Sequence, residues 1–236
     1  MRDDDMIYDN IVKATFVKRP NRFIAHCIVD GKEEIVHVKN TGKCKELLIE
    51  GCTVYLQEHD NPNRKTKYSL ISVVKGNRLI NMDSQVPNKI AYEALLNKKI
   101  ILPGLEEELL TIKPEKTYKS SRFDIYIETK TKKAFVEVKG VTLEENGVVL
   151  FPDAKTERGV KHVGELIEAS KDGYVSYILF VVQMDNVKYF TPNIKMHQEF
   201  GDMLKKASLS GVNIISYDCN VSENSITINE EVKVIL

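Results

Sequence analysis

The sequence predicts a small all-β barrel followed by a mixed α/β domain. The first third contains five short stretches rich in β-branched and aromatic residues, and the remainder alternates strand and helix patterns. The chain has 236 residues, of which 42% are hydrophobic, and this length is sufficient for two modest domains. We therefore expect residues 1–83 and residues 84–236 to form the two domains.

Five strands are expected in the first domain, at residues 11–16, 23–29, 33–38, 53–58 and 67–75. The pair Asp30-Gly31 separates two of them and supplies the positive φ angles of a two-residue hairpin. These two strands should therefore be antiparallel neighbours. The strand pattern ends near residues 81–87, after which the apolar residues take up a helical spacing.

The second domain should combine helices with a sheet. The expected elements are strands at residues 122–128, 133–139, 174–183 and 213–218 and helices at residues 88–96, 157–170 and 196–208. The strand at 174–183 is almost continuously apolar, which is typical of a central strand covered on both faces. This order of elements indicates helices packed against the sheet.

The charge balance limits the classes of partner. The chain carries 34 Lys+Arg and 34 Asp+Glu residues, and its net charge of zero argues against coating nucleic acid by bulk electrostatics. Residues 10–83 hold 13 basic and 8 acidic residues, so a polyanion should favour the first domain. A surplus of this size is also ordinary for a solvated surface.

The sequence shows no sign of a membrane or secreted protein. Its longest strongly apolar run, residues 177–182, is far shorter than the roughly 18 residues of a membrane span. The chain begins Met-Arg-Asp-Asp-Asp with no apolar segment behind it, so no secretory signal is visible. We expect a cytoplasmic protein with no membrane partner; its oligomeric state is left open.

The pair of strands around the tight polar turn near residue 130 is the most informative part of the sequence. Because side chains alternate along a strand, Glu137 and Lys139 share one face. On the preceding strand, Phe123 and Ile125 should share the face opposite Asp124. An acid and a base within an otherwise apolar strand are costly to bury unless they are paired or bind a ligand. If the register places Asp124 beside Glu137, two carboxylates and an ammonium form one cluster.

Such a cluster is suited to a magnesium site that acts on a phosphate. Asp124 and Glu137 would hold Mg²⁺ (or Mn²⁺), which retains waters that carry the nucleophile. Lys139 would orient or help to deprotonate the attacking water and offset charge on the phosphorane. The alternative is a solvated hairpin face with a cross-strand pair of Lys and acid, which is common in antiparallel sheets.

Seven segments spread along the chain together resemble one known family. They are Asn40-Thr41-Gly42, Asn61-Pro62-Asn63-Arg64-Lys65, Pro87-Asn88, Ser121-Arg122-Phe123-Asp124, Glu137-Val-Lys-Gly-Val-Thr-Leu143, Phe151-Pro-Asp-Ala-Lys-Thr-Glu-Arg-Gly-Val-Lys-His162 and Phe180-Val-Val-Gln183. In this order they resemble the sugar fermentation stimulation protein A (SfsA) family over almost the whole chain. The pattern Asp-x(12)-Glu-x-Lys also resembles the PD-(D/E)xK nuclease superfamily. The Asn40-Thr41-Gly42 segment departs from the family pattern, because Lys39 replaces the usual Pro before it and Lys43-Cys44 replace the usual Ser-Met after it.

The resemblance implies an N-terminal OB-fold barrel followed by a PD-(D/E)xK nuclease-like mixed α/β domain. It also implies non-specific DNA binding and a regulatory role in sugar (maltose) metabolism. Nucleases of this superfamily often supply another acidic residue from the preceding helix, which makes Glu93 a candidate catalytic residue. Taken alone, Glu93 is an ordinary exposed helix glutamate.

The helix expected at residues 157–170 carries a polar stripe. Arg158, Lys161, His162 and Glu165 recur at helical spacing, so they should lie along one face. Three potential cations on one stripe are suited to holding the phosphate oxygens of a nucleic acid. The alternatives are a solvated helix face and, for His162, a structural hydrogen bond.

A second candidate nucleic-acid site follows the Asn-Pro turn of the first domain. Arg64, Lys65 and Lys67 precede Tyr68, and mixed basic and aromatic residues on an OB barrel can grip phosphates and stack a base. A solvated basic loop is the alternative. In the second domain, Gln183 ends the buried strand, either at the edge of the candidate site or as a simple strand terminus.

Three functions fit these observations. The first is a DNA-binding protein with a Mg²⁺-dependent nuclease-like site that hydrolyses phosphodiester bonds. The second is a non-catalytic, non-specific DNA-binding regulator that keeps the site without turnover. The third is an RNA-binding or protein-interaction adaptor. The sequence leaves open whether the protein is an enzyme.

Overall fold

The barrel expected in the first third is present and closed. The structure, a computed structural model, describes residues 6–40 and 42–236, so the acidic start and Thr41 lie outside the described residues. The barrel strands are β2 (Ile11–Asn21), β3 (Ile24–Val29), β4 (Lys32–Val38), β5 (Thr53–Glu58) and β6 (Tyr68–Lys75), followed by β7 (Arg78–Asn81). The order β4-β3-β2-β5-β6 is closed by a parallel pairing of β4 with β6. All five predicted strands are thereby confirmed.

Local residue chemistry explains the β3–β4 hairpin. Asp30 and Gly31 adopt φ values of 48° and 79°, the left-handed conformation that a two-residue hairpin turn requires. Along β3, Ala25, Cys27 and Val29 are buried while the residues between them are half-buried. This period of two directs one face of the strand into the barrel core.

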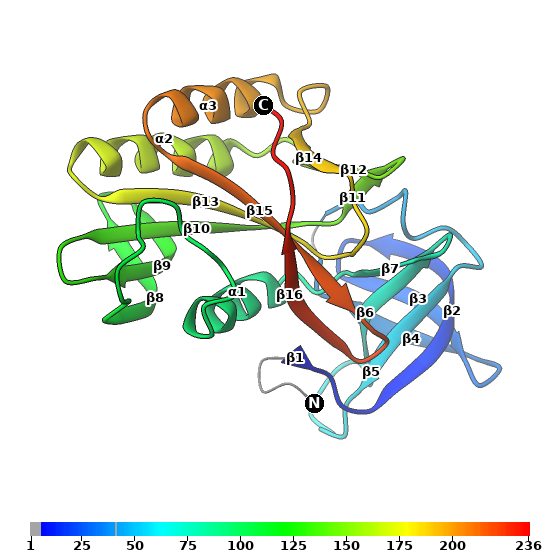
Figure 1. Cartoon of the computed structure of the whole chain (residues 1–236). Helices are drawn as coiled ribbons and strands as arrows, with labels where there is room; N and C mark the ends of the chain where they lie inside the picture. The colour runs from blue at the N-terminus through cyan, green and yellow to red at the C-terminus, as the bar shows by residue number, and fades with distance from the viewer. Residues whose placement is uncertain (1–5, 41) are drawn as a thin grey trace.

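The second sheet has seven strands, in the order β1-β16-β15-β13-β10-β9-β8 (Figure 1). Its strands are β1 (Met6–Ile7), β8 (Thr111–Tyr118), β9 (Ser121–Glu128), β10 (Lys133–Val141), β13 (Val175–Val182), β15 (Asn213–Val221) and β16 (Ser225–Glu231). The strands β10, β13 and β15 are parallel to one another, and the remaining pairings are antiparallel. The strand β1 precedes the division expected after residue 83, but it pairs with β16. It therefore belongs to the sheet of the second domain.

Helices cover both faces of this sheet. The helix α1 (Val86–Leu96) lies on one face, and α2 (Glu157–Lys171) and α3 (Gln198–Leu209) lie side by side on the other (Figure 1). Alternate residues of β13 join the two cores: Phe180 packs with the α2 and α3 side, and Leu179 packs with the α1 side. The prediction that this apolar strand is central and covered on both faces is confirmed.

Several short elements were not predicted. A small sheet of β11 (Leu143–Glu145), β12 (Val148–Phe151) and β14 (Tyr189–Pro192) lies between the barrel and α3 (Figure 1). The edge strand β8 also escaped prediction, because its middle reads Lys-Pro-Glu-Lys and is exposed. In the described part of the chain, no helix combines the length and apolarity needed to cross a membrane.

Buried polar contacts join the barrel to the second domain. Gln183 is 1% exposed, and its side-chain amide donates to Asn81 Oδ1 and to the backbone carbonyl of Asp83, both at 3.0 Å. Lys39, which directly follows β4, forms an ion pair with Asp83 at 2.6 Å. Gln183 therefore does more than end a strand: its hydrogen bonds hold the linker between the two domains in place.

Candidate active site between two diverging strands

The candidate site lies where β9 and β10 separate. Their ladder pairs Ile125 with Val136, which places Asp124 opposite Glu137 at the next position. The Asp124 side chain reaches across the gap, and its Oδ2 accepts the backbone N–H of Val138 at 2.8 Å. The structure thus brings Asp124 and Glu137 together, as the register hypothesis requires.

The expected alternation along β9 is wrong at one position. Phe123 packs against Phe135 on the α2 side, with ring centroids 5.0 Å apart, whereas Ile125 lies in the core on the α1 side. The neighbouring strand β8 has Glu115 at a φ of 52°, and no ladder pair joins it to Asp124. The strand bends at this point, so simple alternation fails there.

Glu137 is the most buried member of the cluster. It is 2% exposed, and its Oε1 contacts Lys139 Nζ at 2.5 Å and His162 Nδ1 at 2.6 Å. Burial alone would raise the pKa of Glu137, but the hydrogen bond from His162 and the charge of Lys139 together lower this pKa. Its second oxygen, Oε2, is buried without a hydrogen-bond partner among the described residues.

Asp124 has the opposite electrostatic balance. Desolvation and the nearby charge of Glu137 raise the pKa of Asp124, and they outweigh the hydrogen bonds from Val138 and Asn88. Asn88 Nδ2 donates to Asp124 Oδ1 at 2.7 Å. Two adjacent carboxylates, one with an unpartnered buried oxygen, are suited to a hard divalent cation with oxygen ligands.

Among the described residues, no hydrogen bond or ion pair joins Glu93 to this cluster. Its carboxylate lies 3.9 Å from Lys89 Nζ on the same helix. Asn88 and Glu93 are five residues apart, which separates them by about 140° around the helix axis. The α1 residue that contacts Asp124 is therefore Asn88, which sequence reasoning did not identify as a site residue. The only sequence signal for it was the Pro87-Asn88 segment, in which Pro87 lies in the first turn of α1.

The predicted stripe on α2 is divided between the site and the surface. His162 is only 5% exposed; its Nδ1–H donates to Glu137 and its Nε2 accepts from Arg158 Nε at 3.3 Å. The expectation that His162 directly contacts nucleic acid is therefore corrected to a buried hydrogen-bonding role. Arg158 and Lys161 are exposed, and Lys161 Nζ donates to Ser120 O at 3.3 Å.

The predicted basic group on the barrel is partly engaged in local contacts. Arg64 Nη2 donates to Ser69 Oγ at 3.1 Å, and Lys67 forms an ion pair with Glu58 at 2.6 Å. Lys67 Nζ also lies 5.2 Å from the centroid of the Tyr68 ring. Lys65 is exposed. The charge of Lys67 is therefore offset by Glu58, and Arg64 and Lys65 are better placed to meet a phosphate.

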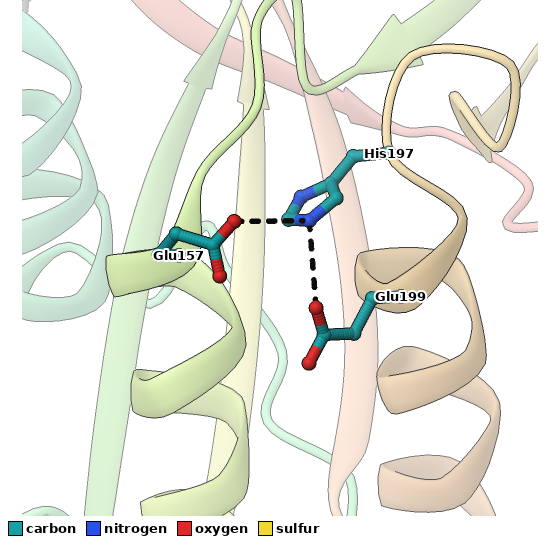
Figure 2. A group of neighbouring side chains, drawn as sticks. All are labelled: Glu157, His197 and Glu199. Atoms are coloured by element: carbon teal, nitrogen blue, oxygen red, sulfur yellow. Dashed lines mark ion pairs between the residues drawn. The ribbon is translucent and has the colours of Figure 1, made fainter.

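A separate group of possible metal ligands lies at the N-terminal ends of α2 and α3. The ligand atoms of Glu157, His197 and Glu199 all lie within 4.8 Å of one another (Figure 2). His197 Nδ1 accepts the backbone N–H of Thr156 at 3.3 Å, so the ring proton is on Nε2 and faces the two carboxylates. A metal ion would need the Nε2 lone pair, so this hydrogen bond opposes metal binding.

A small cavity lies at the end of β10. Its volume is about 160 Å³, and it is lined by residues from both domains, including Asn40, Ser84, Gly140, Asp153 and Gln183. Gly140 directly follows Lys139 in the sequence. The junction between the two domains therefore contains a cavity whose wall includes the residue that follows Lys139.

Comparison with known proteins identifies the family. The model described as "Sugar fermentation stimulation protein RE domain" matches residues 85–225, and the "SfsA N-terminal OB domain" model matches residues 17–82. The first-domain barrel is thus an OB domain.

Relatives cover the chain from end to end. Sugar fermentation stimulation protein homologs of Clostridium beijerinckii and Desulfitobacterium hafniense are each 58% identical, over 98% and 97% of this chain and 100% and 98% of theirs. The structure of Pyrococcus furiosus SfsA, solved in complex with Ca²⁺, is 28% identical and superposes with a TM-score of 0.87 over 98% of each chain. The chain belongs to the sugar fermentation stimulation protein (SfsA) family.

Proposed function

We propose that the protein hydrolyses phosphodiester bonds of DNA with Mg²⁺ or Mn²⁺ held by Asp124 and Glu137. The observation that supports this most strongly is the unpartnered buried Oε2 of Glu137 beside a carboxylate whose pKa is raised. An orphaned buried carboxylate oxygen is expensive unless a ligand satisfies it. A divalent cation satisfies it and also relieves the repulsion between the two acids.

Each residue then has a distinct role. The bound cation would polarise a phosphate oxygen and lower the pKa of a bound water. Lys139 would lie beside that water, because its ammonium is already fixed against Glu137, and would offset charge that develops on the phosphate. Asn88 and the Val138 N–H hold the Asp124 carboxylate in place. His162 keeps Glu137 ionised.

The related solved structure supports the metal class. Pyrococcus furiosus SfsA was solved with Ca²⁺, which prefers the same hard oxygen ligands as Mg²⁺. DNA as the substrate rests on the OB barrel and its surplus of basic residues, since OB folds commonly bind nucleic acid strands. Contacts from basic side chains to phosphates carry no sequence information, so we expect binding to be largely independent of sequence.

One observation favours a second function, a non-catalytic DNA-binding regulator of sugar metabolism. Lys139 forms a direct ion pair with Glu137, which already compensates one buried carboxylate without any metal. A protein that only binds DNA would gain a stable core from this pair. The names of the relatives refer to sugar fermentation, so this role remains a proposal for the chain.

A cleavage assay separates the two functions. Supercoiled, linear and single-stranded DNA are incubated with the protein in Mg²⁺, in Mn²⁺ and in EDTA. Metal-dependent cleavage that disappears in Lys139→Ala supports the enzyme. Binding to DNA without cleavage of any substrate supports the regulator and overturns the enzyme. Cleavage that persists in Lys139→Ala also contradicts the proposed site, because that activity must come from elsewhere.

A further inference from the structure

A large basic pocket on the barrel lies outside the residues assigned so far. It has a volume of about 610 Å³ and lies between the end of β2 and the segment at residues 42–50, with Ala154 of the second domain on its rim. Its basic lining residues are Lys18, Arg19, Arg22, Lys43 and Lys45, and its only acidic lining residue is Glu50. The volume matches pockets that take a ligand of nucleotide size.

The basic residues of this pocket divide into two kinds. Arg19 builds the wall, because its guanidinium donates to the backbone carbonyls of Gly42, Lys43, Arg22 and Asn40 at 2.6–2.9 Å. The side chains of Lys18, Arg22, Lys43 and Lys45 are exposed, and within the described residues none of them forms an ion pair. These four cations are available to an anionic ligand.

The base of the pocket is apolar. Phe16 and Leu48 are 3% and 9% exposed, and together with Val17 they form a surface with no charged group. Arg22, one of the lining residues, has its guanidinium 5.8 Å from the centroid of the adjacent Phe23 ring, which is 52% exposed. An apolar floor, an exposed aromatic ring and surrounding cations are the combination that holds a base and its flanking phosphates.

The pocket adjoins the cavity at the domain junction. Gly42 lines both this pocket and the cavity at the domain junction, whose wall includes Gly140 directly after Lys139. Asp153 is close enough to Gly42 that a side chain there would collide with its carboxylate, so the passage is narrow.

We propose that this pocket binds an unpaired nucleotide of a nucleic acid strand and directs that strand toward Asp124 and Glu137. The inference rests on the proposed function and specifies its substrate as single-stranded or locally unpaired nucleic acid. In a duplex the base faces are stacked and paired, so a base enters the pocket only after it is freed. The protein should therefore bind single strands more tightly than duplexes.

The test is a binding titration in EDTA, where no cleavage occurs, using the full chain. The probes are a single-stranded oligonucleotide of about 12 nucleotides and its duplex, because an OB domain covers roughly 4–16 nucleotides. The pocket variant is Lys43→Ala/Lys45→Ala, and the control is Lys205→Ala/Lys206→Ala, which removes two exposed lysines from α3. A second variant, Ala154→Phe, narrows the pocket without changing charge.

The pocket variant should bind the single strand more weakly and show a salt slope smaller by about 1.4, from about 0.7 per lost phosphate contact. Between 50 and 200 mM salt this corresponds to about sevenfold less loss of affinity than in the unchanged protein. Ala154→Phe should remove the preference for the single strand, and the control should change neither quantity.

Two outcomes overturn the inference. If the unchanged protein binds nucleic acid but the two pocket variants behave like the control, the strand does not use this pocket, while the proposed function stands. If the pocket variants lose affinity for the single strand and for the duplex equally, the pocket is a general phosphate-binding surface. The proposal that it binds an unpaired nucleotide is then wrong. If the unchanged protein binds neither probe, the proposed function itself fails.

Discussion

Two neighbouring carboxylates in the site have opposite protonation tendencies. Glu137 is held ionised by His162 and Lys139, whereas burial and the charge of Glu137 raise the pKa of Asp124. Pairs of titratable groups whose environments push their pKa values apart are typical of sites that bind a cation or move a proton. The metal proposed here would reverse the balance at Asp124 by stabilising its charged form.

The first prediction concerns the replacement Asp124→Asn. The pKa of Asp124 in the folded protein lies above its unfolded value of about 4. The stability that Asp124 contributes therefore falls as the pH rises through the folded pKa. In EDTA at pH 7 the variant should therefore melt at or above the temperature of the unchanged protein, and the difference should vanish toward pH 4. Thermal melts at several pH values measure this.

Metal provides the control for that prediction. Mg²⁺ at about 100 times its Kd should raise the Tm of the unchanged protein by about 5–10 °C, and should leave Asp124→Asn unshifted. A variant that is strongly destabilised in EDTA would mean that Asp124 is structural. An equal metal shift in both proteins would place the cation elsewhere.

The second prediction concerns His162, which acts through Glu137. The folded pKa of Glu137 is lowered, so the stability it contributes is present above its unfolded pKa and is lost as pH falls through the folded pKa. His162→Leu removes a buried donor and should cost about 1–3 kcal/mol at pH 7, and less in acid. Chemical denaturation at pH 7 and pH 4 gives the two values.

His162→Gln is the matched variant, because its amide keeps a donor for Glu137. It should recover most of the stability and most of any cleavage. If both variants lose stability equally at the two pH values, the contribution of His162 is packing alone, and its link to the charge of Glu137 is wrong.

Residue-level prediction from sequence succeeded where local geometry is regular. Strand alternation put Glu137 and Lys139 on one face because β10 runs without interruption. It failed for Phe123, since the bend at Asp124 depends on the neighbouring strand. Asn88 was missed as a site residue, because spacing along α1 does not reveal which of its side chains meets Asp124.

At the scale of elements, a close contact of α1, β10 and β13 fixes the site. A Cβ atom added at Gly140 would lie 2.7 Å from both Gln183 Oε1 and Pro87 Cγ. Pro87 lies in the first turn of α1, next to Asn88, which donates a hydrogen bond to Asp124. The absence of a side chain at Gly140 therefore lets the three elements meet behind Lys139.

The third prediction tests this contact. Gly140→Ala should destabilise the protein by about 1–3 kcal/mol through overpacking and should weaken metal binding by displacing Asn88. The control is Gly164→Ala in α2, where nothing lies within 4 Å of the added atom, and it should stabilise by about 0.5–1 kcal/mol. Equal stability of the two variants would show that the junction is loose.

Elements were predictable from sequence where their apolar residues form a clear periodic pattern. The five barrel strands, α1, α2, α3 and the central strand β13 all carry long periodic patterns. The strands β7, β11, β12 and β14 are three or four residues long, so a period of two has no room to appear. Their existence depends on contacts between distant parts of the chain.

At the scale of the whole molecule, the two domains are tied together more closely than the sequence suggests. The N-terminal strand β1 crosses to pair with β16. Glu144, which is 5% exposed, forms ion pairs with Lys75 at 2.9 Å and Arg78 at 3.0 Å across the domain boundary. Such long-range pairings leave no local signal, so a division read from composition cannot place them. They hold the basic pocket in a fixed position relative to Asp124 and Glu137.

The central claim is that Asp124 and Glu137 bind the catalytic metal. Crystals soaked in Mn²⁺ and measured at a wavelength where manganese scatters anomalously give the most direct test. We expect an anomalous peak about 2.0–2.2 Å from Glu137 Oε2 and from the Asp124 carboxylate. A peak confined to Glu157, His197 and Glu199, or no ordered peak at either group, would contradict it.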